Sequence, residues 1–220
     1  MKLFLLIGQS NMAGRGKIEE QDKVPHPRVF ILTKALTWVP AVDPLHYDLP
    51  SRVGVGLAST FARVVAEAEP RQMVGLIPAA FGGSALDEWK PGGKHYSNAV
   101  ARAREAMKRG QLVGILWHQG ESDGSAEQIA IYAERFRTMI TQLRKDLDAD
   151  VPVLVGELGR FRPANAPLNV VLATLSKTVS RCVFVPAEGL NDKGDGVHFD
   201  SAALREFGRR YARAWLETVK

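Results

Sequence analysis

Residues 3–12 read LFLLIGQSNM, and this stretch decides the fold. The apolar run 3–7 is typical of a buried strand, and Gly8 and Ser10 follow directly at its C-terminal end. In an open α/β sheet, that end of a strand borders the ligand crevice. Ser10 is therefore a candidate nucleophile, although a serine at this point can equally cap the following helix.

Strand-like and helix-like segments alternate along the rest of the chain. Strands are expected at residues 3–7, 73–77, 113–117, 153–156 and 182–185, and helices at 55–68, 98–109, 126–147, 166–180 and 202–219. Residues 28–39 form an excursion with the character of a hairpin, followed by an irregular loop over 40–52. The alternation predicts an α/β protein, a three-layer α/β/α sandwich around a five-stranded parallel sheet.

The predicted sheet brings distant polar residues together. In the flavodoxin-like strand order 2-1-3-4-5, the first and third strands flank the switch point. Ser10 follows the first strand and Gln119 follows the third, so we expect the two residues side by side. Gly82 and Gly83 follow the second strand and should lie on the same rim.

A second candidate segment lies near the C-terminus, where residues 195–199 read DGVHF. An aspartate three residues before a histidine can hold the imidazole in one tautomer and leave the other ring nitrogen free to accept a serine proton. Alone, this spacing is more often a solvated loop. With Ser10, however, Asp195 and His198 complete the three residue types of an acyl-transfer triad.

Four stretches together resemble the SGNH (GDSL-like) hydrolase superfamily, in particular its branch of sialate O-acetylesterases and acetyl xylan esterases. They are residues 8–12 (GQSNM), 78–89 (PAAFGGSALDEW), 117–123 (WHQGESD) and 192–200 (DKGDGVHFD). The resemblance implies the flavodoxin-like SGNH hydrolase fold. It also implies a serine esterase that removes O-acetyl groups from carbohydrates through an acyl-enzyme on Ser10.

The same resemblance implies an oxyanion hole built from three donors. These are the backbone amides of Ser10 and Gly83 and the side-chain amide of Gln119, where most of the superfamily has an asparagine. Gly83 is preferred to Gly82 as the backbone donor. Glutamine has one more methylene of reach, so this donor departs from the general superfamily pattern.

Two further polar residues are expected to support the site. Glu121 is a second carboxylate that could orient His198, but we favour Asp195 because its tether to the histidine is local. Asn11 is expected to tie the first loop to its neighbours rather than to contact substrate. Both are therefore treated as supporting residues.

The remaining histidines and aromatic residues carry weaker expectations. His26, His46 and His95 should be solvated loop residues, whereas His118 should be packed and hydrogen-bonded at a strand end. No histidine spacing is typical of a metal site, so neither a metal nor another cofactor is expected. Aromatic side chains expected either to border the site or to pack beneath loops are Trp38, Tyr47, Phe81 and Trp89, with Trp117 in the core.

The composition sets limits on the class of protein. With 220 residues, 45% of them hydrophobic, the chain is expected to form one domain over residues 1–220. The net charge of +5 arises from scattered lysines and arginines, which favours solvated helix faces over a nucleic-acid-binding surface. Cys182 is the only cysteine, so no intrachain disulfide can form. We expect neither a signal peptide nor a membrane span, and hence a cytoplasmic location.

Two rival functions remain open at this point. One is an SGNH enzyme that acts on longer acyl chains, such as a lysophospholipase or thioesterase. The other is a non-catalytic glycan-binding domain. Among acetylated sugars, we expect small soluble substrates, such as acetylated xylo-oligosaccharides, sialic acid or other monosaccharides, in preference to insoluble polymer. The sequence leaves the oligomeric state undetermined.

Overall fold

The computed structural model describes residues 1–219, and a central sheet organises them. The strands run in the order β3-β2-β4-β1-β5-β6-β7, and all neighbours are parallel except β2 and β3. Their bounds are β1 (Lys2–Gly8), β2 (Val29–Leu32), β3 (Trp38–Pro40), β4 (Val74–Pro78), β5 (Gln111–His118), β6 (Val153–Gly156) and β7 (Cys182–Val185).

The five strands predicted from the apolar runs are present, and they follow the predicted order 2-1-3-4-5 as β4-β1-β5-β6-β7. The expected number of strands in the sheet is corrected from five to seven. The segment 28–39 does form a hairpin, but its first strand pairs with β4 and so extends the sheet at that edge. Val29, Ile31 and Leu32 are buried there, which explains why this hairpin joins the sheet.

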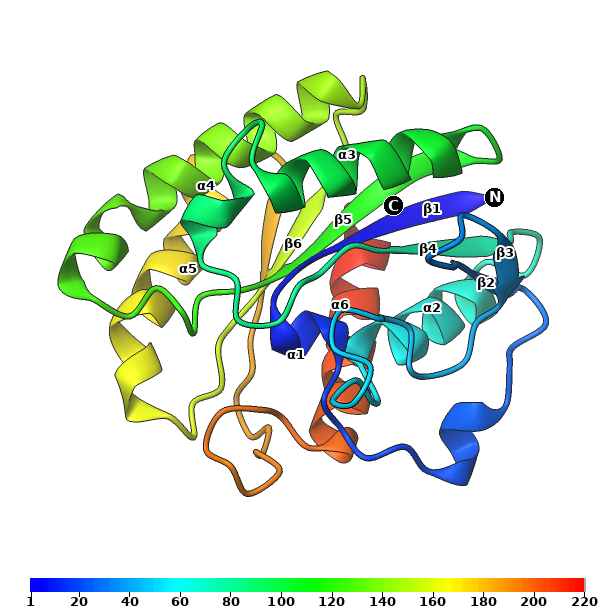
Figure 1. Ribbon diagram of the computed structural model, residues 1–220, viewed down its shortest axis with the longest axis horizontal. Coiled ribbons are helices and arrows are strands. Elements are labelled where there is room, and N and C mark those ends of the chain that lie inside the picture. The colour runs from blue at the N-terminus through cyan, green and yellow to red at the C-terminus, as the bar shows by residue number, and fades with distance from the viewer. Residues whose placement is uncertain (220) are drawn as a thin grey trace.

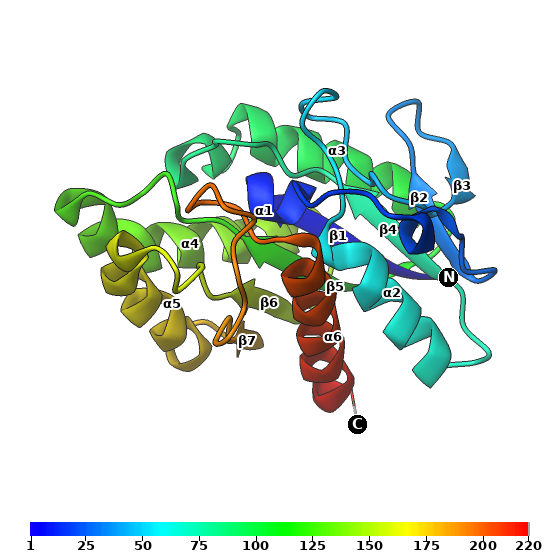
Figure 2. The same cartoon turned by 90° about the horizontal axis from the view of Figure 1, so that it is seen from below.

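Helices cover both faces of the sheet, as Figures 1 and 2 show. One face carries α3 (Lys94–Met107), α4 (Ala126–Asp146) and α5 (Ala166–Thr178), and the other carries α2 (Leu57–Ala68) and α6 (Ser201–Thr218). The short elements are α1 (Ser10–Ala13) and the single-turn helices η1 (Glu20–Lys23), η2 (Leu86–Trp89) and η3 (Pro163–Asn165). The structure is therefore the predicted three-layer α/β/α sandwich.

The pair α2 and α6 shows how the sequence builds one of these layers. Phe4 of β1 meets Phe61 of α2 and Trp215 of α6 edge-on, with ring centroids 4.8 and 5.0 Å apart. The two helices approach closely at Gly208, where a Cβ atom would lie 2.2 Å from the carbonyl oxygen of Leu57. A larger residue at 208 would push the two helices apart.

A glycine at the end of β1 positions the nucleophile. Gly8 has φ of +128°, and a Cβ atom there would lie 2.1 Å from the carbonyl oxygen of His118. No other residue fits, because both the torsion and the close approach require glycine. The chain then turns, and the N–H of Gln9 donates to that same carbonyl at 2.9 Å. Ser10 thus begins α1 beside the end of β5.

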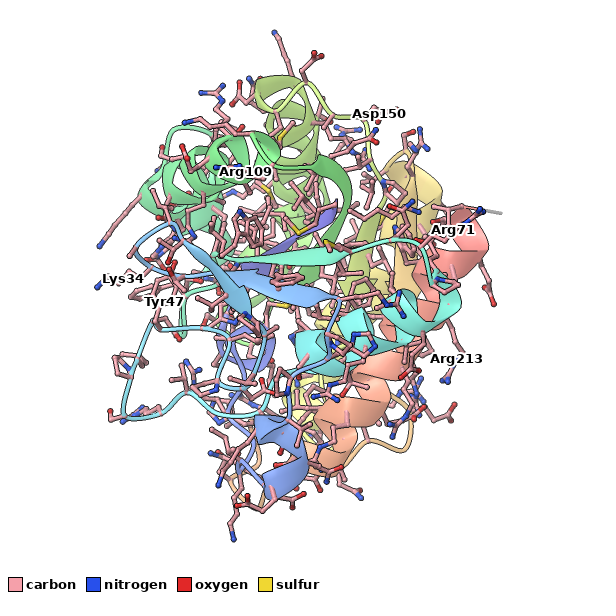
Figure 3. All side chains as sticks on the ribbon, turned by 90° about the vertical axis from the view of Figure 1, so that its right-hand side faces the viewer. Lys34, Tyr47, Arg71, Arg109, Asp150 and Arg213 are labelled. Atoms are coloured by element: carbon pink, nitrogen blue, oxygen red, sulfur yellow. The ribbon has the colours of Figure 1, made fainter. Side chains whose placement is uncertain are left out.

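Charged side chains are distributed over many elements of the surface. Figure 3 labels Lys34 in the β2–β3 turn, Arg71 after α2, Arg109 after α3, Asp150 before β6 and Arg213 in α6, all at the periphery of the molecule.

Two histidines that were expected to be solvated are instead buried. His46 lies in the loop before α2 and His95 in the first turn of α3, and each is less than a tenth exposed. The rings of Phe81 and Trp89 pack against His95, with centroids 4.6 and 5.4 Å from its ring, and the local sequence does not reveal these contacts.

Asp43 makes the stability of the fold dependent on pH. Burial raises its pKa to about 7, although hydrogen bonds from the Ser59 hydroxyl and the Gly56 N–H oppose the shift. The folded protein therefore holds this proton more tightly than the unfolded chain does. Stability from Asp43 is present in full below about pH 4 and is lost as the pH rises to about 7, up to about 4 kcal/mol in all.

The variant Asp43→Asn should remove most of this dependence, because the amide keeps an acceptor and carries no charge. We expect the free energy of unfolding in urea to fall less between pH 5 and pH 8 in the variant than in the wild type. Asp148→Asn, at an exposed carboxyl, is the matched control. Identical slopes for wild type and Asp43→Asn would show that the Asp43 carboxyl does not titrate in this range.

Candidate active site

The three residues of the predicted triad lie in line at the C-terminal edge of the sheet. The Nε2 atom of His198 lies 3.1 Å from the hydroxyl oxygen of Ser10, and its Nδ1 atom lies 2.7 Å from Asp195 Oδ2. Ser10 begins α1, while the other two residues come from the loop between β7 and α6, which lies beside α1 in Figure 2. The geometry allows the imidazole to take the serine proton while the carboxylate fixes its tautomer.

The loop that carries His198 is braced from within. The second carboxylate oxygen of Asp195 accepts hydrogen bonds from the backbone N–H groups of Val197 and His198 at 3.0 and 2.8 Å. Burial pushes the pKa of Asp195 upward, but the hydrogen bonds from the His198 ring and from these backbone groups outweigh it and lower the pKa. Asp195 therefore stays ionised at working pH. Asp192 pairs with Phe199 across the base of the loop and accepts hydrogen bonds from the N–H groups of Gly194 and Gly196.

Asn11 joins this loop to the first one. Its side-chain amide donates to Glu121 Oε1 at 2.6 Å and to the carbonyl of Val197 at 3.2 Å, and its oxygen accepts from the N–H of Phe199 at 3.1 Å. Glu121 thus contacts Asn11, and no hydrogen bond joins it to His198 among residues 1–219. Of the two carboxylates left open by the sequence, Asp195 is the one in contact with the base.

The turn after β4 presents a backbone N–H to the same region. The N–H of Gly82 donates to Asp48 at 2.7 Å, whereas that of Gly83 has no acceptor within the described part of the chain. Gly83 has φ of +78° and open space on its Cβ side. Arg15 binds the same oxygen of Asp48 at 2.7 Å, and both side chains of this ion pair are almost fully buried. The turn is therefore rigidly held with the Gly83 N–H free.

Gln119 braces the other side of this turn, which corrects its expected role. Its side-chain nitrogen donates to the carbonyl of Ser84 at 3.0 Å and to the carboxylate of Asp123, and its oxygen accepts from the Tyr132 hydroxyl at 2.9 Å. The side chain is fully buried and does not line the cavity beside Ser10. Both amide hydrogens are engaged, so the structure leaves Gln119 no free donor for an oxyanion.

An open cavity of about 680 Å³ lies over Ser10 and His198. Apolar lining comes from Leu49 and Val197, and cationic lining from arginines and a lysine on separate loops: Arg15, Arg52, Arg162 and Lys193. Two roles were left open for Trp38, Tyr47, Phe81 and Trp89, and none of the four lines this cavity. Trp89 is instead buried and donates to the Ser84 hydroxyl at 2.9 Å, while Trp117 lies in the core as expected.

Some residues of the site escaped the sequence-based prediction. Arg15 and Asp48 form a buried pair although 33 positions separate them, and neither stands in a recognisable motif. Arg52 and Arg162 lie in irregular loops that carry no periodic signal. Gln9 lines the cavity too, and its position next to Ser10 was the one available clue.

Residues 1–219 form neither a metal site nor a membrane-spanning helix. No group of three or more histidine, cysteine, aspartate or glutamate side chains in residues 1–219 could hold a metal ion. Over the same span, the helices are too short or too polar for any of them to cross a bilayer.

His118 is packed as predicted, with Nε2 lying 3.2 Å from the carbonyl of Glu157.

An α/β/α sandwich that holds serine, histidine and aspartate in contact on loops at the ends of its parallel strands has the geometry of a serine hydrolase. The chain belongs to the carbohydrate esterase family described as sialic acid-specific acetylesterase, which matches residues 1–217. This membership supports an esterase that removes acetyl groups.

Individual relatives agree with this assignment. A protein of Arabidopsis thaliana described as a probable carbohydrate esterase is 32% identical over 239 residues, covering 98% of this chain and 90% of the relative. An X-ray structure of an Arabidopsis thaliana protein superposes with a TM-score of 0.92 at 30% identity and covers 98% of both chains.

More distant structures share the fold. The crystal structure of NanS has a TM-score of 0.80 at 20% identity and covers 99% of this chain and 97% of its own. A carbohydrate acetylesterase from Xanthomonas citri has a TM-score of 0.71 at 18% identity, with 97% and 55% covered.

Proposed function

We propose that the protein removes O-acetyl groups from carbohydrates through an acyl-enzyme on Ser10. The observation that carries this proposal is the continuous chain of contacts from the Ser10 hydroxyl through His198 to Asp195, with separations of 3.1 and 2.7 Å. Family membership and the carbohydrate esterase from Arabidopsis thaliana support the acetyl group and the sugar.

The proposed reaction has two halves. Ser10 Oγ attacks the acetyl carbonyl carbon while His198 Nε2 takes the hydroxyl proton, and the carbonyl electrons move onto oxygen. Collapse of this tetrahedral intermediate expels the sugar oxygen, which receives the proton from His198. Water then attacks the acetyl-Ser10 ester while His198 takes its proton, and the bond between Ser10 Oγ and the acetyl carbon breaks as His198 returns the proton to Oγ, which releases the acetate product. Asp195 stabilises the imidazolium that forms in each half.

The backbone N–H groups of Ser10 and Gly83 are the proposed donors to the oxyanion. Neither has another acceptor among residues 1–219. Preorganised donors of this kind stabilise the charge that develops in the transition state without rearranging. The ion pair Arg15–Asp48 and the Ser122 hydroxyl, which donates to the Gly83 carbonyl at 3.1 Å, keep the turn in this position.

The charges around the cavity favour a sugar that carries a carboxylate. Arg52 and Arg162 line the cavity, and neither forms an ion pair with any described residue. An arginine without an ion-pair partner is well suited to bind a carboxylate, which accepts two hydrogen bonds from one guanidinium. The family description names a sialic acid, a sugar of this kind. We therefore propose a small acidic acetylated sugar as the substrate class.

A matched pair of substrates tests the role of these arginines. We expect kcat/KM for acetate release from an O-acetylated sialic acid to exceed that from its carboxyl methyl ester by about 10- to 100-fold, the effect of one charged hydrogen bond. The double variant Arg52→Gln/Arg162→Gln should lose this preference and retain its rate on an uncharged aryl acetate. Equal rates on acid and ester in the wild type would contradict a carboxylate-binding role.

The length of the acyl group distinguishes this proposal from a long-chain esterase. Each methylene that enters an apolar groove contributes about 0.8 kcal/mol, so a lysophospholipase should improve steadily with chain length. Here, among residues 1–219, the apolar lining of the cavity comes from Leu49 and Val197. We expect kcat/KM for 4-nitrophenyl esters to be highest for acetyl and to fall at butyryl and octanoyl. A rise towards octanoyl would favour the long-chain alternative, and no hydrolysis of any ester would favour the glycan-binding one.

A further inference from the structure

Gln9 carries an amide that the folded chain leaves unused. The residue lies between the end of β1 and Ser10, is 2% exposed and lines the cavity over the triad. Its Oε1 atom is buried without a partner, and its side chain forms no hydrogen bond with any residue from 1 to 219. Buried amides are nearly always hydrogen-bonded, because an unpartnered one lowers stability. The Nε2 atom, which is the donor of this amide, likewise has no acceptor among residues 1–219, and it is the atom whose hydrogen bond a ligand oxygen beside the nucleophile can complete.

The contrast with Gln119 sharpens this interpretation. The two glutamines follow the neighbouring strands β1 and β5, so both reach the same edge of the sheet. The amide of Gln119 is saturated by Ser84, Asp123 and Tyr132 and lies outside the cavity. Of the two, Gln9 alone has a polar group available to a substrate.

We propose that the side-chain amide of Gln9 is a catalytic hydrogen-bond donor to the oxyanion, in addition to the backbone N–H groups of Ser10 and Gly83. This inference rests on the proposed esterase function. When Ser10 Oγ bonds to the ester carbon, the carbonyl π electrons become the negative charge on oxygen, and Gln9 donates an N–H to that oxygen. Collapse of the intermediate restores the carbonyl and weakens this hydrogen bond, so no proton is transferred to or from Gln9.

The variant Gln9→Met tests the proposal, because methionine has a similar size and no donor. We expect kcat for an aryl acetate to fall by about 10²–10³-fold, with KM within about threefold of the wild-type value. Because the side chain of Gln9 makes no hydrogen bond with residues 1–219 in the free protein, the melting temperature should stay equal or rise. Gln119→Met is the matched control and should lower the melting temperature, since it removes three hydrogen bonds.

A second readout does not depend on acetylesterase activity. An aryl alkylphosphonate phosphonylates a serine nucleophile: the Oγ–P bond forms as the P–O bond to the aryloxide breaks, and the phosphonyl oxygen takes the place of the oxyanion. We expect mass spectrometry to show labelling of Ser10 in the wild type and labelling slowed by about 10²-fold or more in Gln9→Met. If the wild type is labelled but hydrolyses no acetate ester, the proposed substrate is wrong while the comparison between wild type and Gln9→Met still decides the role of Gln9.

Several outcomes would overturn the inference. A kcat within about threefold of wild type together with unchanged labelling would show that Gln9 contacts no developing charge. A raised KM at constant kcat would make it a ground-state binding residue instead. A melting temperature that falls along with kcat, or failure of Gln9→Met to fold, would make its role structural. Absence of any labelling at Ser10 in the wild type would remove both this inference and the nucleophile on which it rests.

Discussion

Replacing Ser10 with alanine should lower kcat for an aryl acetate by about 10⁴- to 10⁶-fold, because the reaction then has no nucleophile. Among residues 1–219, the hydroxyl of Ser10 forms one hydrogen bond, the one to His198. Its removal should therefore leave the fold and the melting temperature nearly unchanged. The measurement is steady-state hydrolysis by the purified variant, combined with thermal unfolding followed by circular dichroism.

Ser97→Ala serves as the control, since this serine is exposed on α3, away from the cavity. It should retain the wild-type rate. If Ser10→Ala kept more than a few per cent of the wild-type kcat after contamination was excluded, Ser10 would not be the nucleophile. A large fall in melting temperature would instead indicate a structural role for the hydroxyl.

The second large effect is expected at Asp195. Asparagine can still accept the backbone hydrogen bonds within the loop, but it presents an N–H to His198 Nδ1 and so favours the wrong tautomer. We expect Asp195→Asn to lower kcat by about 10⁴-fold, the order seen for the equivalent change in a serine-protease triad. Kinetics of the variant at several pH values would measure the effect.

Glu121→Gln is the matched comparison, because it changes another carboxylate in the cavity by the same chemistry. Glutamine retains an oxygen to accept the hydrogen bond from Asn11, which Glu121 now accepts at 2.6 Å. Its effect on kcat should be much smaller, although loosening of Asn11 could displace the loop slightly. The reverse order of the two effects would assign the orienting role to Glu121.

The local parts of this structure could be predicted from the sequence, and the parts that depend on distant pairing could not. Asp195 and His198 are three residues apart, so their contact follows from the tether alone. The hairpin of β2 and β3 extends the sheet because β2 pairs with β4, more than 40 residues away, and no local pattern indicates this partner. The ion pair of Arg15 and Asp48 has the same long-range character.

Gln119 shows a second limit on what could be predicted from the sequence. Its position at the end of the third predicted strand was right, but the direction of its side chain was not available from the sequence. Gly120, with φ of +149°, and Gly8, with φ of +128°, set the course of the backbone at these two strand ends. Such torsions decide which glutamine faces the cavity, and glycine permits many of them.

The hydrogen bonds within the loop from Asp192 to Phe199 hold the residues that transfer the proton, whereas the arginines proposed to bind the sugar lie on other loops. His198 and Asp195 are held in place by hydrogen bonds within this loop and by Asn11, although Lys193 and Val197 of the same loop also line the cavity. The arginines at 52 and 162 stand on other loops and touch none of its hydrogen bonds. Changes in the loops that carry Arg52 and Arg162 can therefore alter which sugar is bound without changing the contacts between Ser10, His198 and Asp195. This makes the scaffold suitable for engineering new ester specificities by loop exchange.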